Sequence, residues 1–294
     1  MECALSDLRG FVSILHALQL ENRKDYPLEI FIDKQGVGFH SMTQAGDVMI
    51  QCVLTPDWFH QFRVDDQIYN SLSQNTVHAA CYNFSLVLPH FLHYIQAFGL
   101  GASMILKYLP EEKKLQLILT HKDGRSECFI QVHQSQCFSA LSDWNHTDCL
   151  FEIHSFFFSQ PKRLRDSLMD IQDNSELTSK IILQVSPLEQ NNGSESRKDT
   201  LSEEQSVLTM NVTTQCSSCC IAFPYTPQLF PVFQVKTTHR YTYATKVFLM
   251  LQKPLALASR CSMWLSPHGL LHASLTLKGT PSLQFRMVVQ SLHT

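Results

Sequence analysis

Two stretches of the sequence, Asp7-Leu-Arg-Gly-Phe-Val-Ser-Ile-Leu-His-Ala-Leu18 and Pro161-Lys-Arg-Leu-Arg-Asp-Ser-Leu-Met-Asp-Ile-Gln172, start 154 residues apart. In both, apolar residues recur at three- and four-residue intervals, the spacing of one face of an α-helix. In the second stretch this face consists of Leu164, Leu168 and Ile171. The sequence therefore predicts an amphipathic helix near the start of each half of the chain.

Outward from these helices, most of the sequence alternates between apolar and polar residues, which is typical of half-buried strands. Residues 28–32 show this alternation clearly, and residues 115–131 form a predicted hairpin with Asp123-Gly124 in its turn. A second hairpin is predicted over 263–277, and its last strand is expected to pair with residues 282–289. Short antiparallel strands should therefore make up most of the fold.

Helical spacing returns near residues 85–98 and over about 244–253, where we expect the helix to stop at Pro254. The same elements thus occur twice in the same order, and the hairpin turns at Gly124 and Gly279 are 155 residues apart. Such a layout is typical of an internal repeat. We predict an α+β protein with two tandem domains.

The domain boundaries follow from two polar segments. Residues 133–148 are predicted to connect an N-terminal domain, 1–132, to a C-terminal domain, 149–294. Residues 187–206 are polar and nearly free of large apolar side chains, so we expect a flexible insertion there.

Composition limits the class of protein. The chain has 294 residues, 44% hydrophobic and 17% charged, enough for two packed cores. Its net charge of −3 argues against a uniformly basic surface but allows a local one. We expect no signal peptide and no membrane span, and we interpret the ten cysteines as reduced thiols of an intracellular protein. Glycosylation motifs at Asn83, Asn145, Asn192 and Asn211 leave a secreted β-rich binding protein as an alternative.

Four segments carry a resemblance to a known family. They are Ser13-Ile-Leu-His-Ala-Leu18, Trp58-Phe-His-Gln-Phe-Arg-Val64, Thr238-His-Arg-Tyr-Thr-Tyr243 and Gly269-Leu-Leu271. With these, over about residues 2–290, the chain resembles the Rad-one family of subunits of the nine-one-one DNA-damage checkpoint clamp. It resembles the proliferating-cell nuclear antigen more distantly.

The resemblance implies two sliding-clamp domains, each with pore-lining helices backed by antiparallel sheets. It implies a nuclear, non-catalytic subunit that forms a ring with two other clamp subunits around double-stranded DNA, without sequence specificity. It further implies a clamp loader, checkpoint kinase signalling and tethered repair proteins. A homotrimeric replicative clamp is the alternative with the same fold.

DNA that slides through a ring must be held by its phosphates, because base-specific contacts would stop it. The residues that we expect to face DNA lie on the four predicted helices. They are Arg9, His16, His90, His93, Lys162, Arg163, Arg165, Lys246 and Lys253. The alternative for each is an ordinary solvated helix face. His90 and His93 depart from the family pattern, because clamps commonly have lysines at these positions of the second helix.

The candidate partner-binding residues are apolar. Phe138, Leu141 and Trp144 have three-residue spacing in the polar connector, where they could anchor it to its own domain or contact partners. In clamps this connector borders a groove for short hydrophobic peptides. The resemblance adds Met42, Leu277 and Phe285 to this groove.

Metal chemistry has little support in the sequence. Cys216-Ser-Ser-Cys-Cys220 has the spacing of half a zinc site, but no second pair completes it. A metal-dependent 3'-5' exonuclease, the alternative from another class, needs clustered carboxylates. Asp65-Asp66, Asp166 with Asp170, and Glu203-Glu204 are close in sequence, but we expect them at a strand end, on a helix flank and in the polar insertion. We expect no metal and no cofactor.

Overall fold

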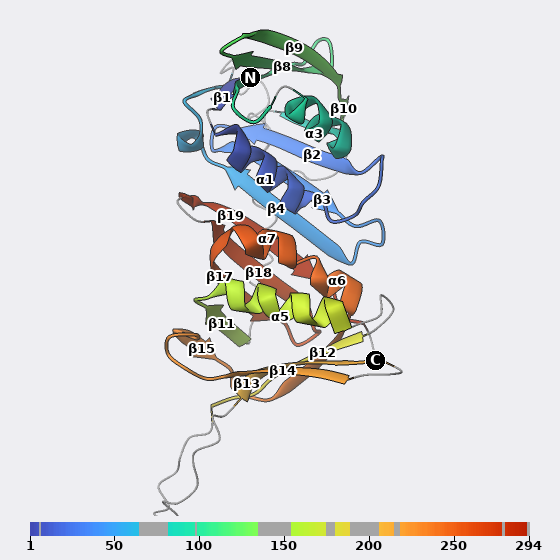
Figure 1. Ribbon diagram of the computed structural model, residues 1–294, viewed down its shortest axis with the longest axis vertical. Helices are drawn as coiled ribbons and strands as arrows, with labels where there is room; N and C mark the ends of the chain where they lie inside the picture. The colour runs from blue at the N-terminus through green and yellow to red at the C-terminus, as the bar shows by residue number, and fades with distance from the viewer. Residues whose placement is uncertain are drawn as a thin grey trace, which may run out of the picture. The chain divides into compact units, whose positions relative to one another are not determined.

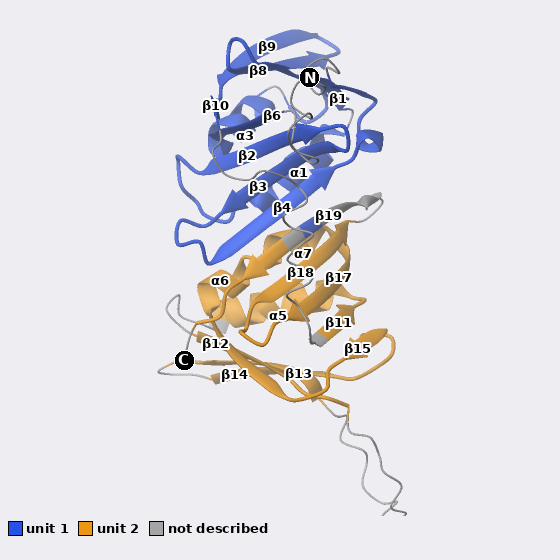
Figure 2. Cartoon of the chain, turned by 180° about the vertical axis from the view of Figure 1, so that it is seen from behind, with its two compact units in different colours: residues 1–149, 280–285 blue, residues 150–279, 286–294 orange. Residues whose placement is uncertain are grey.

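The computed structural model describes residues 1–5, 7–64, 82–97, 99–134, 154–174, 180–188, 206–214, 218–277 and 280–292. Within the chain, residues 1–149 with 280–285 form one compact unit, and residues 150–279 with 286–294 form a second (Figure 2). Most of the predicted connector at 133–148 and of the predicted insertion at 187–206 lies outside the described residues.

In the residues that the structure describes, the first unit has two groups of antiparallel strands, two α-helices and one 3-10 helix. Its elements are β1 (Glu2–Leu5), α1 (Leu8–Leu18), β2 (Pro27–Asp33), β3 (Gly36–Met42), β4 (Val48–Leu54), η1 (Pro56–Trp58), β5 (Gln61–Arg63), β6 (Tyr82–Val87), α3 (Leu88–Gln96), β7 (Ser103–Leu109), β8 (Lys114–His121), β9 (Gly124–Gln131) and β10 (His133–Gln134). The strands follow the orders β5-β1-β7-β8-β9 and β10-β6-β2-β3-β4.

The second unit has the same kinds of element. Among the described residues they are β11 (His154–Phe158), α5 (Pro161–Asn174), β12 (Lys180–Val185), β13 (Ser206–Thr213), β14 (Ser218–Pro224), β15 (Val232–Gln234), β16 (His239–Ala244), α6 (Thr245–Leu249), α7 (Gln252–Leu257), β17 (Ala258–Leu265), β18 (Leu271–Leu277) and the second part of β19 (Thr280–Val289), whose residues 280–285 belong to the first unit. Their strand orders are β15-β11-β17-β18-β19 and β16-β12-β13-β14.

The two units repeat one topology. When β1 is matched to β11 and each later strand to its counterpart, the order β5-β1-β7-β8-β9 becomes β15-β11-β17-β18-β19. The order β6-β2-β3-β4 likewise becomes β16-β12-β13-β14. This match confirms the internal repeat and the α+β fold that the sequence predicts.

The first core forms where α1 packs on the strands. Asp7 begins this helix, because its carboxylate accepts the backbone N–H of Gly10 at 2.8 Å. The apolar face of α1 is buried, and the ring of Phe11 lies 5.8 Å from Phe39 on β3 and 6.2 Å from Phe91 on α3. Figure 1 shows α1 and α3 on one side of strands β2, β3 and β4.

The second core repeats this arrangement. Leu164, Leu168 and Ile171 of α5 are at most 1% exposed, as their spacing predicts. Contacts join α5 to α7 and to β17. Figure 1 shows α5, α6 and α7 side by side over strands β17 and β18. In both units, burial of an apolar helix face leaves the opposite face to carry charge.

Two helix bounds differ from the prediction. The helix α3 begins at Leu88, because residues 82–87 pair with β2 as strand β6. The helix expected to stop at Pro254 instead breaks after Leu249 and resumes at Gln252, with Pro254 inside α7. A proline is tolerated in the first turn of a helix because its missing N–H would have no partner within the helix.

Leu168 and its neighbour Met169 test this description of α5. Leu168→Ala removes a side chain with no exposed surface and should lower the free energy of unfolding by about 2–5 kcal/mol. Met169 is 49% exposed, so Met169→Ala should change it by no more than about 0.5 kcal/mol. Urea unfolding followed by circular dichroism measures both. Equal losses for the two variants would contradict the packing described for α5.

Candidate functional site

On the first unit, the predicted DNA-facing residues lie on the exposed faces of two helices. Arg9 and His16 are exposed on α1, and His90 and His93 are exposed on α3. The two helices are joined by a hydrogen bond in which the Gln96 amide donates to His16 Nε2 at 2.9 Å. The first unit therefore presents one arginine and three histidines on one pair of helices.

On the second unit, the cationic residues at the start of α5 differ in their exposure and in whether they form an ion pair. Lys162 and Arg163 are exposed. Arg165 is half-buried and donates to Asp166 from Nε at 3.2 Å and from a terminal nitrogen at 2.8 Å. This ion pair partly neutralises Arg165, so it is a weaker candidate for phosphate contact than its two neighbours.

The exposed charge of α5 changes sign along the helix. Its first turn has no acidic residue, and its last turn has no basic one. Asp170 and Asp173 are exposed in the second half. Cations near the amino end and acids near the carboxyl end both oppose the helix dipole, which favours the reverse placement. This arrangement costs stability, so a bound anion near the amino end would offset part of that cost.

The last two candidates, Lys246 on α6 and Lys253 on α7, are also exposed. Lys253 differs in that the protein around its ammonium group removes part of its hydration and lowers its pKa. With Lys162 and Arg163, the second unit thus presents four exposed cations on one helix layer.

The predicted partner-binding residues are not all accessible. Met42, the last residue of β3, is 41% exposed. Leu277 is 8% exposed and Phe285 is fully buried, so neither side chain is open to a peptide. Phe138, Leu141 and Trp144 lie outside the described residues. Among the described candidates, Met42 alone has the exposure that partner binding requires.

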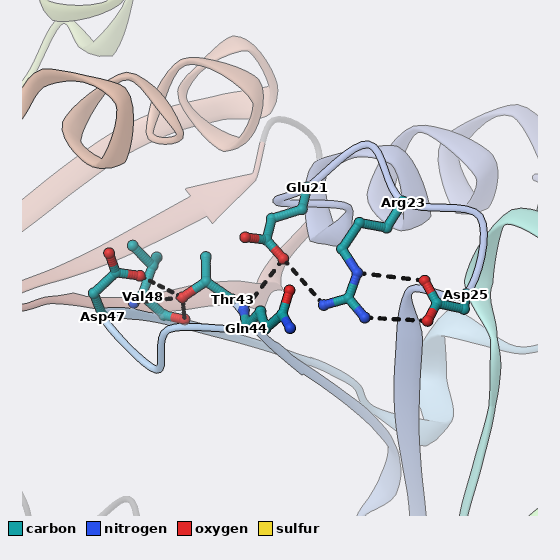
Figure 3. A network of polar contacts seen from close by, with 7 residues as sticks. All are labelled: Glu21, Arg23, Asp25, Thr43, Gln44, Asp47 and Val48. Atoms are coloured by element: carbon teal, nitrogen blue, oxygen red, sulfur yellow. Dashed lines mark hydrogen bonds and ion pairs between the residues drawn. The ribbon is translucent and has the colours of Figure 1, made fainter. Parts of the chain in front are cut away.

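A polar network lies beside Met42. It could not be predicted from the sequence, because it joins residues about twenty positions apart. In Figure 3, the carboxylate of Glu21 accepts the backbone N–H of Gln44 at 3.2 Å. Arg23 lies 3.6 Å from Glu21 and donates to both oxygens of Asp25. The network ties the loop after α1 to the turn between β3 and β4.

Metal-binding groups can be assessed over part of the chain. Among the described residues, no group of three or more histidine, cysteine or acidic side chains could hold a metal ion. Cys219 and Cys220 lie on β14, whereas Cys216 and two of the three acidic pairs, Asp65-Asp66 and Glu203-Glu204, lie outside the described ranges. The third pair, Asp166 and Asp170, lies on α5, where Asp166 is paired with Arg165. No helix among the described residues is long and apolar enough to span a membrane.

The lowered pKa of Lys253 gives a prediction with a definite sign. The folded chain should release this proton at a lower pH than the unfolded chain, whose lysines titrate near 10.5. Between the two values the unfolded chain binds more protons, so the unfolding free energy should rise with pH there. NMR titration of carbon-13-methylated lysines, folded and in urea, measures the shift, with Lys253→Arg assigning the signal. Equal midpoints in the two states would contradict it.

Comparisons with known proteins agree on family and fold. The family model "Rad1: Repair protein Rad1/Rec1/Rad17" matches residues 1–276. A chain of the PCNA2–PCNA3 complex from Sulfolobus tokodaii superposes with a TM-score of 0.70 at 9% identity, covering 99% of each chain. No curated protein sequence matches the chain. The chain belongs to the Rad1/Rec1/Rad17 family of repair proteins, with the sliding-clamp fold of a DNA-damage clamp subunit.

Proposed function

We propose that the chain is a non-catalytic, nuclear subunit of a heterotrimeric clamp that encircles damaged DNA. In this role it supports checkpoint kinase signalling and tethers repair factors. The main observation behind the proposal is the repeated helix-on-sheet unit whose exposed cations lie on helix faces. Its family and its clamp fold support the same assignment.

The proposed mechanism is topological: a closed ring retains the DNA, and the helices need only contact phosphates weakly. Contacts to phosphates carry no sequence information, so they allow sliding. The exposed candidates of the first unit are one arginine and three histidines, and Nε2 of His16 already accepts the Gln96 amide. Arg165 is paired with Asp166. Arg9, Lys162, Arg163 and Lys246 should therefore carry most of this subunit's attraction for DNA.

Ring closure requires edges that pair with other subunits. Among the strands that end these orders in the described part of the chain, other than β4 and β19, β9 and β14 are the longest, with eight and seven residues. A long exposed edge invites pairing with another chain. On β9, the ring of Phe129 is 50% exposed, and Lys114 lies over it at 5.8 Å. Exposed aromatic rings are common in protein interfaces, so we assign β9 and β14 to contacts with neighbouring subunits.

Partner proteins would use the surface around Met42. This side chain lies at the end of β3, where an extended peptide could place an apolar residue against it. The buried positions of Leu277 and Phe285 restrict the proposed surface to Met42 among the described residues. Phe138, Leu141 and Trp144 of the connector remain candidates for the rest of the surface.

Assembly is the most direct test of the proposed function. The tagged full chain should co-purify from cell extract with two other clamp-like chains, identified by mass spectrometry. Phe129→Asp should reduce their recovery, because it places a charge in the proposed β9 interface. Leu100→Asp is the matched control, since Leu100 is an exposed apolar residue (37%) outside the strands. Recovery of this chain alone, as a trimer in sedimentation, would favour the homotrimeric clamp.

DNA binding can be tested in the same purified assembly. Lys162→Ala with Arg163→Ala should weaken DNA retention and reduce the slope of log affinity against log salt by about 0.9 for each phosphate that the variant no longer neutralises. Lys122→Ala is the control, because this exposed lysine lies in the hairpin turn between β8 and β9. Salt-dependent fluorescence anisotropy on a short duplex measures the slope. An unchanged slope in the double variant would count against α5 as a DNA-binding helix.

A further inference from the structure

The turn between β3 and β4 is held by bonds within itself. The backbone N–H of Thr43 donates to the carbonyl of Val48 at 3.0 Å, and the N–H of Val48 donates to the Thr43 hydroxyl at 3.1 Å. The Thr43 hydroxyl also donates to Asp47. Gly46 has a φ of 73°, a left-handed conformation that glycine adopts without strain. The turn therefore has a defined shape of its own.

Met42 depends on this turn for its position. Its sulfur lies 4.0 Å from the point that a β-carbon on Gly46 would occupy, so the side chain extends across the turn. Met42 is 41% exposed, so a large part of this side chain is open to a partner. A methionine has three rotatable bonds and adapts to its surroundings. Movement of the turn would therefore move the apolar surface that Met42 offers.

Two hydrogen bonds tie the chain around Met42 to the end of α1 and the loop after it, one from Ser41 at the end of β3 and one from Gln44 in the turn. On one side, the Ser41 hydroxyl donates to the carbonyl of Leu18 at 2.6 Å, and both residues are buried. Leu18 is the last residue of α1, where carbonyls lack partners within the helix. The Ser41 hydroxyl therefore also satisfies the end of the helix that carries Arg9 and His16.

On the other side, Glu21 accepts the N–H of Gln44 at 3.2 Å (Figure 3). Arg23 lies between Glu21 and Asp25, with contacts of 3.6 Å and 3.2 Å, and so restricts the Glu21 carboxylate. This arrangement makes the Gln44 bond charge-assisted, the stronger class of hydrogen bond. The side chain of Glu21 is only 18% exposed, which reduces its screening by water.

We propose that Glu21 and Ser41 are positioning residues for partner binding. They hold the turn so that Met42 is already in place when an apolar side chain of an extended peptide contacts it. Arg23 in turn holds Glu21. The inference rests on the proposed role of Met42 as a partner contact. Its physical basis is preorganisation, because a turn already fixed loses less conformational entropy on binding.

The first measurement needs no partner. In Glu21→Ala, hydrogen exchange at the Gln44 amide should become about three- to tenfold faster, since the bond that this variant removes contributes a modest free energy. Glu21→Gln keeps an acceptor oxygen and should lie between Glu21→Ala and the unaltered chain. Glu112→Ala is the matched control, because Glu112 forms an exposed ion pair with Lys114 at 3.0 Å and lies far along the chain from Gln44. Unchanged exchange in Glu21→Ala would overturn the proposal.

The second measurement uses a peptide of about twelve residues, selected by display on the full chain and shown to lose binding on Met42→Asp. Glu21→Ala should weaken this peptide about two- to tenfold, and Glu112→Ala should not. A peptide that needs Met42 but binds Glu21→Ala normally would overturn positioning and leave Met42 as a partner contact. A selection that yields no Met42-dependent peptide would instead reject the partner surface and, with it, the positioning role.

Discussion

The structure depends on one packing interaction, in which the apolar face of a helix is buried against antiparallel strands. This interaction occurs in each of the two units. In the first unit Phe11 meets Phe39 and Phe91, and in the second Leu164, Leu168 and Ile171 fill the corresponding place. Because a helix can bury only one face in this way, its other face is left to solvent. The exposed face is where the candidate DNA contacts lie, so the packing that forms the fold also determines where charge can be placed.

The sequence predicts those features that repeat along the chain at a fixed spacing. Helices at residues 8 and 161, the hairpin over 115–131 and the twofold repeat are all visible as periodic patterns. The break in the helix before Pro254 is not visible as a periodic pattern, because the effect of a proline depends on where its helix begins. Periodicity shows that Leu277 and Phe285 alternate with polar neighbours but cannot show whether a face is covered. Both proved to be buried.

The candidate site shows the same limit. The sequence places cations on predicted helices, but the pairing of Arg165 with Asp166 depends on side-chain geometry, which residue types alone do not specify. The bond between Glu21 and Gln44 spans 23 residues and involves a backbone N–H, so no residue type marks it. The sequence can thus predict which cationic residues lie on exposed helix faces. How strongly each one can contact DNA depends on the side chains next to it in the folded chain.

One buried hydrogen bond links the two candidate surfaces of the first unit. The carbonyl of Leu18 ends the helix that carries Arg9 and His16, and the hydroxyl that it accepts belongs to Ser41, next to Met42. Both groups are buried, so loss of this bond would leave the carbonyl without a partner and cost free energy. A substitution of Ser41 would therefore disturb both the chain beside Met42 and the end of α1. If Met42 contacts partners as proposed, variation in partner preference should occur at Met42, where the side chain is exposed, more readily than at the buried Ser41, which also bonds to the end of α1.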